Sequence, residues 1–269
     1  WGAIYCHEGA HIQNDENTAV ELYTGGARMV GIAGDGGKPD ILVMRSHMEI
    51  ATVHGVHNAK PGAISLSNVT ESGTVYRPEE VAGYRQLADE FQLNLHMDGA
   101  RFANAVVASG FSPADVTWRA GVDCLSFGLT KNGGIATEAV VMFNSALAED
   151  FAYRRKRTGH LWSKQRFLAA QWLALLENGL WLDNARHANA MARELAAGFA
   201  AHDAIRLPWP VDANELFPVI PEALRGRLRD AGLVFYDWPQ EADMTRFVTH
   251  FGTDPAELAR AVEVIATCQ

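Results

Sequence analysis

The sequence is poor in cysteine and in basic residues. Its 269 residues include three cysteines, Cys6, Cys124 and Cys268, which are widely separated and form no Cys-x-x-Cys pair. This pattern favours reduced thiols and a cytoplasmic protein over a disulfide framework. Lys and Arg number 23 against 32 Asp and Glu, a formal net charge of -9. That balance argues against a broad nucleic-acid surface.

Long apolar runs are missing as well. The most apolar stretch, residues 167–182, is interrupted by Glu177 and Asn178 and is too short to cross a bilayer. No basic-then-apolar secretion signal is visible, so we expect no membrane partner. Since 48% of the residues are hydrophobic, the chain can bury a core that serves one large domain and a smaller one.

The first part of the chain has an α/β pattern. Short apolar runs alternate with amphipathic segments such as residues 78–91, which predicts a layered, mainly parallel sheet covered by helices. The candidate strands are residues 3–6, 27–32, 63–67, 93–97, 124–129 and 139–143.

The second part predicts a long helical connection and a small α+β domain. Residues 163–201 read as helix with a break near Asn178 and Gly179. We therefore expect a large domain at residues 1–162, connecting helices at 163–201 and a small domain at 202–269. Within the small domain, strands are predicted at 205–209, 217–220, 233–238 and 247–251, and helices at 222–231 and 255–266.

Two of the predicted strands end in reactive side chains. Lys131 follows the apolar run 122–129 and precedes a glycine pair, while Asp98 and Arg101 follow the run 93–97. Open α/β sheets bind ligands at the carboxyl ends of their parallel strands. Pyridoxal phosphate (PLP) requires a lysine that forms a Schiff base and a carboxylate that keeps the pyridine nitrogen protonated. The two segments together therefore indicate a PLP enzyme.

Each residue alone has a simpler interpretation. A lysine at a strand end is commonly solvated, and Asp-Gly is commonly a turn. The hypothesis depends on the joint pattern of Lys131 and Asp98, because both follow runs typical of buried parallel strands.

A zinc peptidase motif is the main rival. His7, Glu8 and His11 spell H-E-x-x-H, in which a helix places both histidines one turn apart. Gly9 costs such a helix about 1 kcal/mol relative to alanine, and the residues after His11 have turn chemistry. We therefore expect no metal site.

Several segments carry a resemblance to a known family. The segments LHMDGARFANAV and DCLSFGLTKNGG resemble the cofactor segments of the threonine aldolase and β-eliminating lyase family. The likeness is closest to the bacterial low-specificity L-threonine aldolase branch, and it implies an aspartate aminotransferase-like fold. It extends through GAHIQNDE, ISLSNVTESGTVYRPEE, RKRTGHLWSKQRFLAAQ and MTRFVTHFGT, and so over nearly the whole chain.

The resemblance implies roles for individual residues. Lys131 would form the Schiff base, Asp98 would pair with the pyridine nitrogen, and Arg101 would lie near the ring hydroxyl. His11 would stack on the ring and take part in proton transfer. Arg246 would bind the substrate carboxylate, to which its planar fork is suited.

Two departures from the family pattern stand out. Glu71 occupies a position where some members carry a histidine credited with a role at the substrate hydroxyl, so Glu71 joins His11 as a catalytic candidate. The expected first strand and the loop that binds the cofactor phosphate are missing, so we expect a fragment of the family fold. Phosphate binding would then involve Thr130, or Lys164 and Arg166 from a neighbouring subunit.

The activity implied is retro-aldol cleavage of L-threonine, L-allo-threonine and related β-hydroxy-α-amino acids to glycine and an aldehyde. Another PLP-dependent lyase, racemase or hydroxymethyltransferase activity stays open, because Lys131 and Asp98 serve any carbanion route. A catalytically silent PLP-binding fragment is a further alternative. The family is usually dimeric or tetrameric, so a homodimer or homotetramer with shared active sites is expected.

Overall fold

The computed structural model describes residues 1–239 and 241–268, and its larger part is built on one sheet. The strand order is β2-β1-β3-β4-β5-β6, and every pair is parallel except β5 with β6. This confirms the predicted α/β class and all six strands of the first part. The strands are β1 (Ala3–His7), β2 (Arg28–Ile32), β3 (Pro61–Ser67), β4 (Asn94–Gly99), β5 (Cys124–Gly128) and β6 (Glu138–Met142).

The two faces of the sheet differ in polarity. Side chains alternate between the faces of a strand, and in β4 the buried Leu95 and Met97 belong to the main apolar core, whereas His96 and Asp98 point to the other face. Helices α3 (Ile41–His54), α4 (Pro78–Glu90) and α5 (Phe102–Ser109) contact the strands. Shorter helices α1 (His11–Asn14), α2 (Ala19–Thr24) and α6 (Phe151–Arg157) complete this part.

Helix starts follow the local sequence. Asp40 caps α3 by accepting hydrogen bonds from the backbone N–H groups of Leu42 and Val43. Helix α4 begins with Pro78, a residue suited to the first helical position. The Glu80 side chain also accepts a hydrogen bond from the Arg77 N–H, at 2.7 Å.

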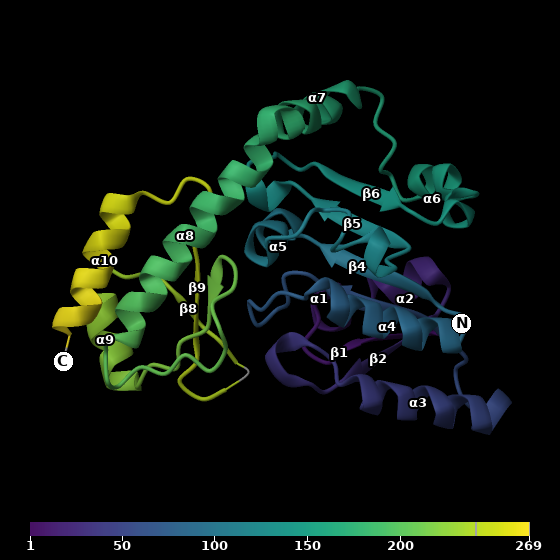
Figure 1. Cartoon of the computed structure of the whole chain (residues 1–269), viewed down its shortest axis with the longest axis horizontal. Coiled ribbons are helices and arrows are strands. Elements are labelled where there is room, and N and C mark those ends of the chain that lie inside the picture. The colour runs from purple at the N-terminus through teal and green to yellow at the C-terminus, as the bar shows by residue number, and fades with distance from the viewer. Residues whose placement is uncertain (240, 269) are drawn as a thin grey trace.

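A long helix leads from the sheet to the C-terminal elements. Helices α7 (Arg166–Leu176) and α8 (Leu180–Ala200) are separated where Asn178 and Gly179 have left-handed backbone conformations, with φ of 55° and 76°. The predicted break is therefore confirmed. Figure 1 shows α8 running between the large sheet and the C-terminal elements. Trp181 and Ala185 of α8 pack in the core of the large sheet, and Ala192 and Phe199 in a second core.

The C-terminal part contains a small antiparallel sheet with the order β7-β9-β8. Its strands are β7 (Glu215–Leu216), β8 (Tyr236–Asp237) and β9 (Thr245–Val248), and its helices are α9 (Glu222–Asp230) and α10 (Pro255–Thr267). Both helices lie within one residue of their predicted bounds, whereas the last strand, predicted at 247–251, begins and ends earlier in the chain, at 245–248.

Two strand predictions in this part were wrong. Residues 205–209 form no strand, and Arg206 makes only an isolated bridge with Val219. Proline has no N–H to donate to a ladder, and Pro208 and Pro210 therefore prevent pairing there. For the same reason Pro218 interrupts the predicted strand 217–220, and β7 forms just before it. The strand predicted at 233–238 is limited to β8.

Within residues 1–239 and 241–268, no helix combines the length and the apolar character that a bilayer crossing requires.

Candidate functional site

Lys131 and Asp98 lie at the same edge of the large sheet. Asp98 is near the end of β4, and Lys131 lies in a short 3₁₀ turn, Thr130–Asn132, directly after the neighbouring strand β5. The two strands are paired in parallel, with Asp98 opposite Ser126. Their carboxyl ends therefore meet where ligands bind in sheets of this kind.

The turn that carries Lys131 is anchored to α8. The Asn132 side chain donates to the carbonyl of Trp181 at 2.7 Å, and the Asn184 side chain donates to the carbonyl of Asn132 at 2.9 Å. Gly133 then adopts a left-handed conformation, with φ of 107°, which glycine tolerates at little cost. The lysine backbone is thereby held by hydrogen bonds on its C-terminal side.

The surroundings lower the pKa of the Lys131 amine, although the residue as a whole is exposed. Burial of the amine is the largest cause, since it disfavours the charged form. The positive charges of Arg101 and Arg246 act in the same direction, while the carboxylates of Glu215 and Asp98 oppose the shift. These charges form one cluster around Lys131.

Glu215 joins the two arginines of this cluster. Its Oε1 atom lies 3.1 Å from Nη2 of Arg101 and 3.1 Å from Nε of Arg246, and it also accepts from Nη2 of Arg246. The Glu215 side chain is 4% exposed. The Arg246 guanidinium in addition lies 5.1 Å from the ring centroid of Trp238. Sequence reasoning found both arginines and missed Glu215.

Burial also lowers the pKa of Arg101, and Glu215 is the main opposing charge. Arginine nevertheless stays protonated in proteins. Within the described part of the chain, the buried Nε of Arg101 has no hydrogen-bond acceptor. This leaves a donor available in the cluster.

Glu71 lies beside the same cluster. Its Oε1 accepts hydrogen bonds from the backbone N–H of His11 at 2.8 Å and from the Ser67 hydroxyl at 2.7 Å. Burial raises the pKa of Glu71, and the hydrogen bonds from His11 and Ser67 oppose that rise. Its other oxygen, Oε2, is buried and finds no hydrogen-bond partner among the described residues.

His11 is attached to this region through its backbone. Its ring Nδ1 lies 2.8 Å from Oε1 of Glu16, and 48% of its side chain is exposed. The ring is therefore held by an acidic neighbour and remains accessible from solvent.

A polar row runs under Asp98 on the same face of the sheet. His96 is hydrogen-bonded through Nδ1 to Ser65 of β3 at 2.8 Å and through Nε2 to Ser126 of β5 at 2.9 Å. Burial lowers the pKa of His96, while the charge of Asp98 opposes that shift. The neutral imidazole is thus favoured. The alternating polar residues Asn94, His96 and Asp98 are a sequence signal that could have revealed this row.

The phosphate candidates lie in different places. Thr130 is exposed at the end of β5, where its backbone N–H donates to Oε1 of Glu138 at 3.3 Å. Lys164 and Arg166 are exposed at the start of α7, and the Arg166 guanidinium lies 4.8 Å from the ring centroid of Phe167. Within the one chain, the charges of Lys164 and Arg166 are not among those that shift the pKa of Lys131. Phosphate binding by Thr130, or by Lys164 and Arg166 from a neighbouring subunit, stays a prediction.

The zinc motif does not form. His7 ends β1, whereas His11 begins the four-residue helix α1, so the two histidines do not share a helix. His7 Nε2 instead lies 3.1 Å from the carbonyl oxygen of Gly34. In the described ranges, no three His, Cys, Asp or Glu side chains are grouped so as to hold a metal ion.

The fold and this site place the chain among α/β proteins that carry a lysine and an acid at the carboxyl edge of a mostly parallel sheet. The chain belongs to the β-eliminating lyase family, whose model matches residues 1–223. The family resemblance found in the sequence is thereby confirmed.

Individual relatives agree with this assignment. The chain is 40% identical over 267 residues to the low specificity L-threonine aldolase of Pseudomonas sp. (strain NCIMB 10558) and 42% identical to that of Pseudomonas aeruginosa. Each match covers 98% of this chain and 76% of the relative. The solved structure of Leishmania major threonine aldolase superposes with a TM-score of 0.90 at 30% identity, over 99% of this chain and 77% of that one. The predicted fold is confirmed.

Proposed function

We propose that this protein cleaves L-threonine, L-allo-threonine and related β-hydroxy-α-amino acids to glycine and an aldehyde, with PLP as cofactor. One observation carries the proposal. Asp98 lies near the carboxyl end of β4 and Lys131 follows the neighbouring parallel strand β5, in a cluster of charges that also contains Arg101 and Arg246. The identity to threonine aldolases supports the choice of substrate.

The residues at the site fit the cofactor. When bound, PLP supplies an electron sink that stabilises the carbanion left after the Cα–Cβ bond breaks. The lowered pKa of Lys131 makes its neutral, nucleophilic amine more abundant near neutral pH. Asp98 would hold a proton on the pyridine nitrogen, because an anion favours a neighbouring cation. The unpaired Nε of Arg101 would donate to the ring hydroxyl.

Arg246 is the candidate for the substrate carboxylate. Its guanidinium projects from β9 into the same cluster as Lys131. A carboxylate held by two parallel N–H donors cannot rotate freely. The substrate would thus be fixed with its Cα–Cβ bond in the orientation that cleavage requires.

Glu71 and His11 are the candidates for the base that takes the β-hydroxyl proton. A general base works best when its pKa lies near the working pH, and burial moves the pKa of Glu71 in that direction. Its unpartnered Oε2 would accept the proton, while Oε1 stays bonded to the His11 backbone and to Ser67.

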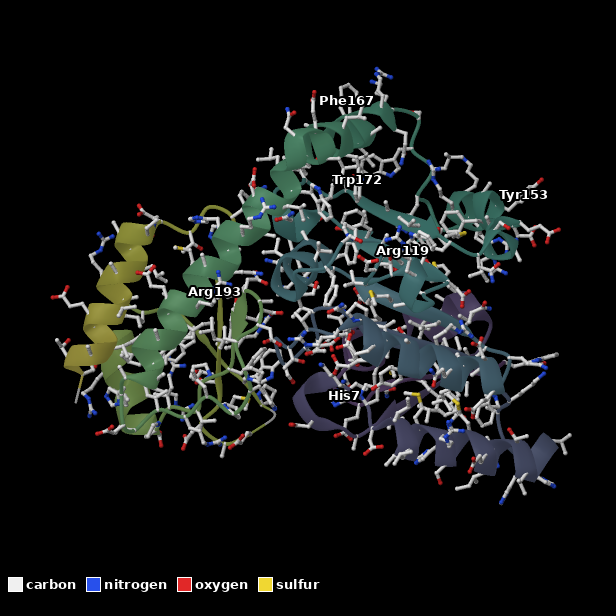
Figure 2. The ribbon with its side chains drawn as sticks, viewed as in Figure 1. His7, Arg119, Tyr153, Phe167, Trp172 and Arg193 are labelled. Atoms are coloured by element: carbon white, nitrogen blue, oxygen red, sulfur yellow. The ribbon has the colours of Figure 1, made fainter. Side chains whose placement is uncertain are left out.

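The proposal also covers the oligomeric state. An exposed apolar face along α7 and the segment before it would be covered by a second copy of this chain, as a homodimer or homotetramer requires. Figure 2 shows Phe167 on the outer side of α7 and Trp172 on the side toward the sheet. The ring centroids of Trp172 and Phe127 lie 4.8 Å apart. The face contains Leu161, Trp162, Phe167, Leu173 and Leu176.

The domain division at residues 1–162, 163–201 and 202–269 and the cytoplasmic location belong to the same proposal. The two apolar cores, which meet along α8, support the division. The three free cysteines are compatible with a reducing compartment.

Product analysis tests the activity. PLP-loaded protein is incubated with L-threonine and with L-allo-threonine, and the products are quantified. Glycine and acetaldehyde in equal amounts support the proposal. Ammonia with a 2-oxo acid would indicate β-elimination, and inversion at Cα without cleavage would indicate racemisation. Cofactor absorbance without any product would indicate the catalytically silent PLP-binding fragment.

A further inference from the structure

Glu215 is a buried acidic residue, and its neighbours in the sequence do not account for its burial. It is an acidic residue between Asn214 and Leu216 in a strand of the small sheet, and its side chain is 4% exposed. A buried carboxylate requires partners that compensate its charge. Here the partners are Arg101 and Arg246, which both contact Oε1.

The small sheet sets the contact with Arg246. Glu215 of β7 lies opposite Val248 of β9, and directly opposed residues of an antiparallel pair point to the same face. Arg246 precedes Val248 by two residues, so its side chain shares that face. Glu215 and Arg246 are thus diagonal neighbours in the sheet.

Arg101 reaches the same oxygen from the large sheet, at the start of α5. The backbone of β7 also lies against the loop that follows Glu71. A Cβ added to Gly73, which has φ of 81°, would lie 2.8 Å from the Glu215 carbonyl oxygen. Glu215 is therefore packed against the loop after β3 and is tied by Arg101 to the segment after β4.

The contacts occupy one edge of the Arg246 guanidinium. Nε and one N–H of Nη2 both donate to Glu215 Oε1, which leaves the second N–H of Nη2 and the N–H groups of Nη1 for a carboxylate on the opposite edge. Arginine presents its donors in a rigid planar fork, so holding one edge sets the direction of the other. Glu215 also carries a negative charge among three basic side chains. It therefore opposes the lowering of the Lys131 pKa that Arg101 and Arg246 promote.

We propose that Glu215 is a positioning residue that orients Arg246 toward the carboxylate of the amino-acid substrate and ties it to Arg101 beside the cofactor. This inference rests on the proposed function, in which Arg246 binds that carboxylate. Loss of Glu215 would free the guanidinium to rotate, and it would leave Arg101 and Arg246 repelling each other.

The test compares two ligands of the PLP-loaded enzyme that differ by one carboxylate, glycine and methylamine. Their binding is followed by the change in cofactor absorbance. In Glu215→Gln, we expect the Kd for glycine to rise about tenfold and the Kd for methylamine to change less than twofold. The KM for L-threonine should rise in parallel with the glycine Kd, and kcat should fall less than KM rises.

Asp237→Asn is the matched control. Asp237 lies on β8 of the same small sheet, has a side chain that is 57% exposed, and pairs with Arg225 and Arg229. It is also an acid changed to its amide, but it does not contact Arg246. Its Kd values for both ligands should equal those of the unchanged enzyme.

Further variants separate the possible failures. Arg246→Ala should weaken glycine binding far more than methylamine binding. If it weakens both equally, the role proposed for Arg246 is wrong. If Arg246→Ala discriminates between the ligands and Glu215→Gln does not, only the inference about Glu215 is overturned.

Glu215→Asp guards against a folding defect. It keeps the charge and shortens the side chain by one methylene, so an intermediate loss of glycine binding is expected. Equal loss of glycine and methylamine binding in both Glu215 variants would indicate a merely structural role and would overturn the inference. A second readout uses the cofactor-free protein, in which Glu215→Gln should lower the pKa of Lys131 as measured by the pH dependence of amine modification.

Discussion

At the scale of single residues, Asp98 tests the cofactor chemistry. Replacing it by asparagine keeps the size of the side chain and removes the charge that would hold the pyridine nitrogen protonated. We expect kcat for L-threonine to fall by roughly 100-fold or more, at about 1.4 kcal/mol for each factor of ten.

The melting temperature and the circular dichroism spectrum of Asp98→Asn should stay close to those of the unchanged protein, since Asp98 is not fully buried. Steady-state kinetics with saturating PLP provide the measurement. Activity within threefold of normal would mean that another group protonates the ring.

Glu71 gives a prediction about stability and pH. The pKa of Glu71 is raised in the folded protein above the ordinary value of 4.5. At pH values between 4.5 and the raised pKa, the folded chain therefore binds more protons than the unfolded chain. Stability contributed by Glu71 is therefore fully present below about pH 4 and is lost as pH rises through the raised pKa. Glu71→Gln lacks this titration.

Urea unfolding of both proteins at several pH values measures the effect. The free energy of unfolding of the unchanged protein, minus that of Glu71→Gln, should decrease as pH rises above about 4.5 and then level off. Each tenfold difference in proton affinity corresponds to about 1.4 kcal/mol. A difference that is constant from pH 4 to pH 8 would refute the burial argument.

At the scale of elements, α7 shows an apolar face that residues 1–239 and 241–268 leave exposed. Leu173 on this face is 71% exposed. Leu173→Asp should shift the protein toward a smaller species in sedimentation, because a charge buried at an interface costs several kcal/mol without a partner.

Leu42→Asp is the control for this prediction. Leu42 lies on α3 and is also 71% exposed, so the same change in charge is made at equal exposure outside the α7 face. Its sedimentation should match that of the unchanged protein. Identical behaviour of the two variants would show that the second copy does not bind on α7.

Elements also show where sequence patterns were sufficient. The six strands of the large sheet could be predicted because each has a run of apolar residues next to loop residues. The break between α7 and α8 could be predicted from Asn178 and Gly179. In the small sheet, the apolar residues around Pro208, Pro210 and Pro218 resemble strands by composition, but proline cannot complete the ladder, and the true strands are short.

At the scale of the whole molecule, the site depends on contacts between distant segments. Lys131 and Asp98 were recognisable because each lies at the end of its own apolar run, and strand ends of a parallel sheet meet at one edge. Glu215 was not recognisable, because its role depends on Arg101 from the large sheet. Nothing local in Asn214 to Leu216 indicates a partner at that distance along the chain.

The proposed function depends on Lys131 as the covalent partner of the cofactor. The visible absorption spectrum of the purified protein with PLP tests it most directly, with Lys131→Ala and, as a control, Lys156→Ala on the exposed helix α6. We expect a yellow Schiff-base band in the unchanged protein and in Lys156→Ala, and its loss in Lys131→Ala. An undiminished band in Lys131→Ala would contradict this role of Lys131.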